Sequence, residues 1–83
     1  MNLTQVRKPT NLQSENIHFL ITKRELEVLR EMSKGLTSKE IAENMYVSIH
    51  TIISHKKSLV QKFNARNAVD LMVKAIRHGF VTL

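Results

Sequence analysis

The sequence contains no cysteine, no tryptophan, one proline and two glycines in 83 residues. Without cysteine, disulfide bonds and thiolate chemistry are excluded, so packing must hold the fold, which suits the cytoplasm. The scarcity of proline and glycine favours a helical chain over an all-β one. The longest apolar runs are only a few residues, such as 19–21, and the N-terminus lacks an apolar signal core. We therefore expect no membrane-spanning segment, no signal peptide and a cytoplasmic location.

A chain of this length forms one small domain with a modest core. Residues 1–20 are polar and aperiodic and contain the only proline, Pro9. They predict a flexible tail or linker. Residues 21–83 are expected to form the domain, with residues 19–21 beginning to pack on it.

Two capping boxes predict the starts of the first two helices: Thr22 with Glu25, and Thr37 with Glu40. The first helix is expected to end at Gly35, which tolerates the left-handed conformation. The charged residues along it predict mostly a solvated face: Lys23, Arg24, Glu25, Glu27, Arg30 and Glu31.

The third helix is predicted from an N-cap at Ser48 to about residue 63, where Asn64 can end it. The fourth is predicted from about residue 67 to about residue 78, with Gly79 ending it. The predicted fold is all-α: a four-helix helix-turn-helix domain behind a flexible N-terminal tail.

The third predicted helix has two opposite stripes at helical spacing. The apolar stripe is Ile52, Leu59, Val60 and Phe63. The other stripe is small, polar and basic, and consists of His50, Ile53, Ser54, Lys57, Ser58 and Gln61. No Asp or Glu occurs in residues 48–63, whereas an ordinary solvated helix includes glutamate for local ion pairs. The pattern is typical of a surface that faces phosphate.

The positive charge belongs to the second half of the chain. Residues 48–83 hold six Lys/Arg and one acid, Asp70, whereas residues 1–47 hold seven Lys/Arg and six acids. A one-sided basic balance indicates a polyanion, with nucleic acid first and an acidic membrane second. A basic protein without such a partner has the same totals, so charge alone favours DNA only slightly.

The fourth predicted helix has more than one apolar face. Leu71 and Ala75 share one face, while Val69 and Val73 point partly elsewhere. Two interpretations stay open: a well-buried terminal helix, or a small exposed patch for self-association.

Catalytic and metal sites are not expected. His50 and His55 are five residues apart, not on one helix face, and no cysteine supplements them. The sequence has neither a paired-carboxylate cleft nor a glycine-rich phosphate loop. We predict a protein that is not an enzyme and has no cofactor.

Four stretches together resemble the LuxR-type (GerE-like) helix-turn-helix domain of bacterial transcription regulators. They are I-T-K-R-E-L-E-V-L (21–29), G-L-T-S-K-E-I-A-E (35–43), V-S-I-H-T-I-I-S-H (47–55) and A-I-R-H-G-F-V (75–81). The resemblance implies four helices, with the second and third binding DNA and the fourth forming the dimer contact. It also implies that such domains follow a receiver or signal-binding domain. The family often has lysine where Ile53 stands.

The resemblance and helix-turn-helix docking together predict the contacts with double-stranded DNA, because the front of the second helix of the motif meets base edges. The predicted base contacts are Ile53, Ser54 and Lys57, with His50 and Ser58 in addition. The predicted phosphate contacts are Thr37, Ser38 and Lys39 at a helix start, and Thr51, Lys56 and Lys62. The predicted dimer contacts are Val69 and Val73.

Two other functions compete with DNA binding. The helix-turn-helix could serve as an interaction module for RNA polymerase or a partner regulator. Residues 49–63 could form an amphipathic helix on a membrane surface, although serines on the polar stripe fit a DNA groove better.

Overall fold

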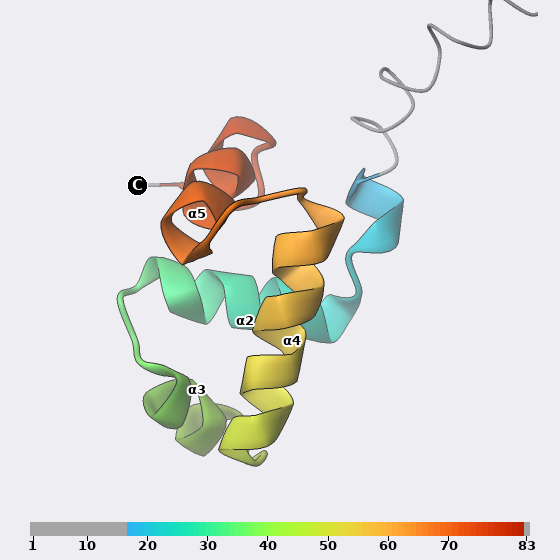
Figure 1. Ribbon diagram of the computed structural model, residues 1–83. Helices are drawn as coiled ribbons and strands as arrows, with labels where there is room; N and C mark the ends of the chain where they lie inside the picture. Colours follow the sequence, from blue (N-terminus) through green and yellow to red (C-terminus); the bar gives the residue numbers. More distant parts are fainter. Residues whose placement is uncertain (1–16, 83) are drawn as a thin grey trace, which may run out of the picture.

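The computed structural model describes residues 17–82, so the tail prediction for residues 1–16 lies outside the described residues. Helices α2 to α5 are labelled in Figure 1, where α4 lies across α2. Their bounds are Lys23–Ser33 for α2, Ser38–Met45 for α3, Ile49–Lys62 for α4 and Ala68–Arg77 for α5. Residues 17–20 are also helical, and no strand occurs within residues 17–82. The all-α prediction is confirmed.

Each of the four predicted helix starts is confirmed by its cap. Thr22 accepts a hydrogen bond from the Glu25 amide at 3.1 Å, and the Thr22 amide donates to the Glu25 carboxylate at 2.9 Å. Thr37 and Glu40 repeat this reciprocal pair at 3.2 and 2.8 Å. Ser48 and Asn67 cap α4 and α5 by accepting from backbone amides three residues on. Local hydrogen bonding therefore sets where every helix begins.

Left-handed residues follow the helices. Gly35, Asn64 and Gly79 all have positive φ, as predicted. Tyr46 after α3 also has positive φ, at 58°, and no sequence signal anticipated it. The Val47 amide donates back to the Ala42 carbonyl at 3.0 Å, and the Tyr46 amide to the Glu43 carbonyl at 3.3 Å. These two bonds form a Schellman motif, which holds Tyr46 in an unfavourable conformation for a non-glycine residue.

The helix α4 packs against α2, α3 and α5 and has the most extensive contacts of the four helices, so it is the centre of the fold. Its core side is formed by Ile52, Leu59 and Phe63. The other buried apolar side chains come from every neighbouring element: Ile17, Val28, Leu29, Ile41, Ala42, Leu71, Ala75 and Val81. Packing around α4 thus fixes which of its faces remains free.

The chain before α2 joins the fold differently from the prediction. Phe19 and Leu20 were expected to pack on the domain, but they are 84% and 51% exposed. Ile17 is buried instead, because the helical turn directs it inward and its neighbours outward. The His18 ring stacks on Phe80 with ring centres 4.5 Å apart. Residues 17–20 are therefore part of the folded unit and contact its C-terminal segment.

Candidate nucleic-acid interface

The outer face of α4 is exposed over its whole length. His50, Ile53, Ser54, Lys57 and Gln61 are all exposed, at the spacing that the sequence predicted. They lie opposite the core side of the helix. The face carries one full positive charge, from Lys57, and no acid.

One flank of α4 meets the start of α3. The Lys56 ammonium donates a hydrogen bond to the Ser38 hydroxyl at 2.6 Å, across the helix-turn-helix. Lys39 is exposed beside this pair. The first-turn amides of α3 have no intrahelical acceptor, and the helix dipole makes this end positive. Two lysines and a helix start therefore combine into one anion-attracting corner, which brings together three residues predicted to contact phosphate.

Thr37 is the N-cap of α3, and Thr51 lies in the first turn of α4. Thr37 is exposed, but its side chain and amide are already used in the capping box with Glu40. Thr51 is half-buried, and its hydroxyl lies 3.1 Å from that of Ser48 at the start of α4.

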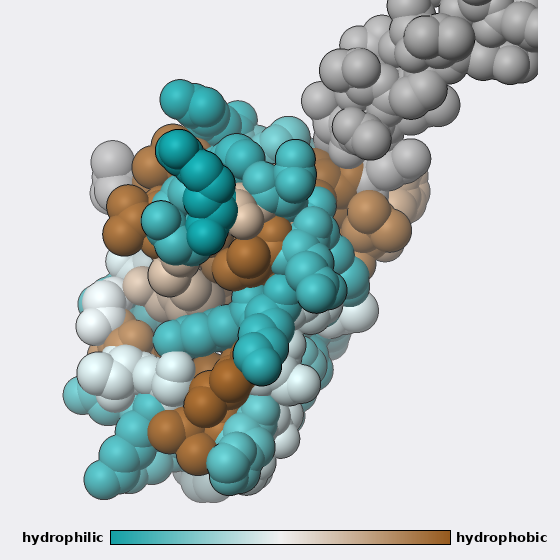
Figure 2. Space-filling model, in the orientation of Figure 1, coloured by the Kyte–Doolittle hydropathy of each residue, from teal (hydrophilic) through white to brown (hydrophobic). Residues whose placement is uncertain are grey.

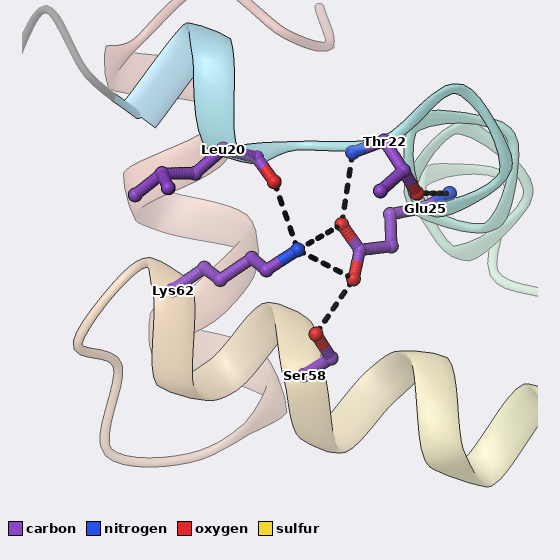
Figure 3. Close-up of polar contacts among 5 residues, drawn as sticks. All are labelled: Leu20, Thr22, Glu25, Ser58 and Lys62. Atoms are coloured by element: carbon purple, nitrogen blue, oxygen red, sulfur yellow. Dashed lines mark hydrogen bonds and ion pairs between the residues drawn. The ribbon is translucent and has the colours of Figure 1, made fainter.

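The opposite flank of α4 is tied to α2 by a network around Glu25 (Figure 3). Lys62 donates to both carboxylate oxygens of Glu25, at 2.8 and 3.0 Å. Ser58, one turn earlier on α4, donates to the same carboxylate at 2.6 Å. Lys62 also donates to the Leu20 carbonyl at 2.8 Å. One carboxylate thus joins α4 to α2, and the lysine joins α4 to the chain before α2.

The prediction that Glu25 lies on a solvated face is wrong. Its exposed fraction is 4%, since the C-terminal half of α4 covers it. Burial by itself would raise the pKa of the carboxyl. Hydrogen bonds from Lys62 and Ser58, together with the Thr22 amide and the charge of Lys62, outweigh burial and lower the pKa from 4.5 to about 2. Glu25 is therefore a carboxylate at neutral pH.

This network also involves two predicted DNA contacts, Ser58 and Lys62. Their polar groups point to Glu25, as Figure 3 shows, and both residues are half-buried. The sequence reasoning missed Glu25 as their partner. The sequence contained only a weak signal for this partner. Ser58 and Lys62 share one flank of α4, and because α4 contains no acid, an ion-pair partner for Lys62 had to come from another element.

The helix α5 presents a separate apolar surface. Leu71 and Ala75 are fully buried, whereas Val69 is 75% exposed and Val73 40% exposed. The two valines are four residues apart and so share one face. Their exposure agrees with the interpretation of Val69 and Val73 as part of a small exposed patch.

Across residues 17–82, no group of three or more His, Cys, Asp or Glu side chains is arranged to hold a metal ion. In the same part of the chain, no helix has both the length and the apolar character needed to cross a membrane.

A short helix, a tight turn and a longer helix with an exposed acid-free face define this domain as a helix-turn-helix of the DNA-binding class. Residues 20–75 match the family described as "Bacterial regulatory proteins, luxR family", and the chain belongs to this family. The resemblance stated from the sequence is confirmed.

Relatives agree with this assignment. The chain is 40% identical over 75 residues to the uncharacterized transcriptional regulatory protein YxjL of Bacillus subtilis, covering 90% of this chain and 34% of that protein. It is 40% identical over 58 residues to the oxygen regulatory protein NreC of Staphylococcus carnosus, covering 70% and 27%. It is 34% identical over 78 residues to BvgA of Bordetella pertussis, named a putative positive transcription regulator of virulence factors, covering 93% and 37%. The chain thus spans about a third of the length of these relatives.

Proposed function

We propose that this domain binds double-stranded DNA sequence-specifically in a bacterial transcription regulator, with α4 in the major groove. The observation that carries the proposal is the exposed face of α4, which lacks any acid and is bordered by the corner of Lys39, Lys56 and Ser38. A major groove admits one α-helix, and the flanking phosphates match the cations. The proposal places the domain in the cytoplasm and assigns it no catalytic role.

The proposed base-facing residues are His50, Ile53, Ser54 and Lys57. Lys57 can donate to O6 and N7 of guanine, and such a contact discriminates by roughly 1–3 kcal/mol. Ser58, also predicted to contact a base, has its hydroxyl committed to Glu25, so we propose an internal role for it.

The proposed phosphate contacts centre on the start of α3. The amides of Ser38 and Lys39, which the capping box does not use, combine with the Lys39 and Lys56 ammonium groups and suit a phosphate at the groove edge. Thr37 and Thr51 stay in the proposed set. Lys62, whose ammonium is held by Glu25 and the Leu20 carbonyl, is proposed to position α4 instead.

We further propose that two domains bind paired half-sites as a homodimer. The exposed face of Val69 and Val73 on α5 is the proposed contact. Half-sites would then lie about one helical turn apart, ~10 bp.

Fluorescence anisotropy with random duplex DNA between 50 and 200 mM salt tests DNA binding itself. If about five phosphates are neutralised, log K should fall with log salt at a slope of roughly −4 to −5. If the domain does not bind duplex DNA at 50 mM salt, the proposal of DNA binding is wrong.

A pair of variants then tests the assigned roles on a site selected from random sequences. We expect Lys57→Ala to relax base preference, because Lys57 faces the bases. Lys39→Ala should weaken all sequences alike, because a phosphate contact carries no sequence information. Equal, sequence-independent losses from both variants would remove Lys57 from the base-reading set.

A further inference from the structure

The outer surface of α4 contains two partly exposed isoleucines that lie outside the packed core. Ile53 is 40% exposed and Ile49, one helical turn earlier, is 39% exposed. Neither belongs to the core or to the half-buried apolar side chains packed against it. The other outward residues of α4 are polar. Two exposed β-branched side chains among them indicate contact with an apolar group outside the chain.

The surroundings of Ile53 define what that partner must be. Ile53 lies in a shallow, largely apolar groove that is lined also by Lys56, Lys57, Val60 and Gln61. Figure 2 shows hydrophobic atoms between α3 and the N-terminal half of α4, with hydrophilic side chains around them. The lysines at the edge and the absence of acids in residues 48–63 require a partner that combines an apolar group with negative charge.

The major groove of DNA offers this combination. The C5-methyl group of thymine is the apolar group on a base edge there, and phosphates flank it. We propose that Ile53 recognises a thymine methyl group, an inference that rests on the proposed function and adds a base identity to it. Ile49, four residues earlier, extends the exposed apolar surface toward the start of α4.

The spacing of Ile53 and Lys57 adds a prediction about the site. The two residues are four apart, so they lie on one helix face about 6 Å apart along the axis. Successive base pairs are about 3.4 Å apart along the duplex. With Lys57 on a guanine, the thymine read by Ile53 lies one or two base pairs away within each half-site.

The test uses the full chain and a duplex selected from a random pool. Each thymine of the selected half-site is replaced in turn by deoxyuridine, which removes only the methyl group and keeps base pairing. We expect one replacement per half-site to weaken wild-type binding roughly fourfold, the effect of leaving one methyl group unburied. The other replacements should have little effect.

The variant Ile53→Ala tests whether Ile53 is the residue that contacts this methyl group. It should bind the thymine duplex about as weakly as wild type binds the deoxyuridine duplex, and it should lose sensitivity to the replacement. Alanine favours helix more than isoleucine does, so α4 stays formed. Leu20→Ala is the matched control: it removes an exposed aliphatic side chain of equal size that is not on α4, and it should keep the full deoxyuridine effect.

The outcomes separate this inference from the proposed function. Salt-dependent DNA binding with equal affinity for thymine and deoxyuridine duplexes at every position overturns the methyl contact alone. So does an Ile53→Ala variant that retains the wild-type deoxyuridine effect. Binding to anionic phospholipid vesicles in the absence of any binding to duplex DNA overturns both.

Discussion

The buried network around Glu25 predicts that Glu25→Gln destabilises the domain through charge alone. Glutamine has the shape of glutamate and still forms a capping box, so the start of α2 is kept. With its single oxygen kept in the capping box, the glutamine NH2 group faces the Ser58 hydroxyl and donates to it. The amide carries no charge to oppose the Lys62 ammonium, so the change removes the ionic tie between α2 and α4 and keeps the start of α2.

The magnitude follows from the pKa of the carboxyl. A shift from 4.5 to about 2 is a stabilisation of the charged form, and at roughly 1.4 kcal/mol per pKa unit it contributes on the order of 3 kcal/mol at neutral pH. The Lys62 side chain is 27% exposed and can turn to water in the variant, which recovers part of this. We expect a loss of about 2 kcal/mol, or roughly 10 °C in Tm.

Urea denaturation followed by circular dichroism measures this loss at several pH values. Because the pKa of Glu25 is lower in the folded state, its stabilising effect is complete above the unfolded value of 4.5. It is lost as pH falls from about 5 toward 2. The difference between wild type and Glu25→Gln should therefore shrink over this range.

The control variant is Glu40→Gln, which alters the same capping motif at the start of α3. Glu40 is exposed and forms no ion pair within residues 17–82. Its replacement should change the free energy of unfolding by less than about 0.5 kcal/mol. Equal effects from the two variants, or a Glu25→Gln effect that stays constant from pH 7 to 3, would refute the ionic account of the network.

Two further predictions concern single exposed positions. Tyr46→Gly should raise the free energy of unfolding by about 1 kcal/mol, measured by urea denaturation, because glycine accepts positive φ and the 94% exposed ring contributes no packing. A lower free energy of unfolding would mean that a contact holds the ring. Val73→Asp should prevent two domains from binding together to a duplex with paired half-sites, and it should leave the affinity for a duplex with a single half-site unchanged. Analytical ultracentrifugation of the variant with each duplex measures this. Two variant domains bound to paired half-sites would exclude Val73 from the dimer contact.

Helix positions were predictable because the signals that set them are local. A cap needs only a hydroxyl or amide side chain and an amide three residues on, so Thr22, Thr37, Ser48 and Asn67 could be identified from the sequence. The outer face of α4 was predictable for the same reason, since helical spacing separates it from Ile52 and Leu59.

The role of Glu25 was not predictable from local pattern. The capping boxes at 22–25 and 37–40 read alike in the sequence, yet Glu25 is buried and Glu40 exposed. The difference lies in tertiary packing: the partners of Glu25 are 33 and 37 residues away on α4. A burial pattern created by a crossing helix cannot be read from spacing along α2.

The left-handed conformation of Tyr46 was also not predictable from local sequence preference. Local preference places asparagine or glycine in the left-handed conformation, and Asn44 lies only two residues earlier. The half-buried Val47, which follows Tyr46, packs against the core, and this packing fixes where the chain must reverse. Tertiary packing therefore imposed on Tyr46 a conformation that its own preferences oppose.

The two flanks of α4 together suggest how affinity and specificity are divided. Glu25→Gln and Glu40→Gln each raise the net charge by one, which by itself strengthens binding to any duplex. Only the Glu25 change removes the ionic tie between the C-terminal half of α4 and α2. A loosened helix would hold the proposed base contacts Lys57 and Ser54 less uniformly. Both variants should thus bind random DNA slightly more tightly, whereas Glu25→Gln alone should lose preference for the selected site. Equal preference in the two variants would mean that apolar packing by Ile52, Leu59 and Phe63 suffices to hold the recognition face, and that the Glu25 network serves stability only.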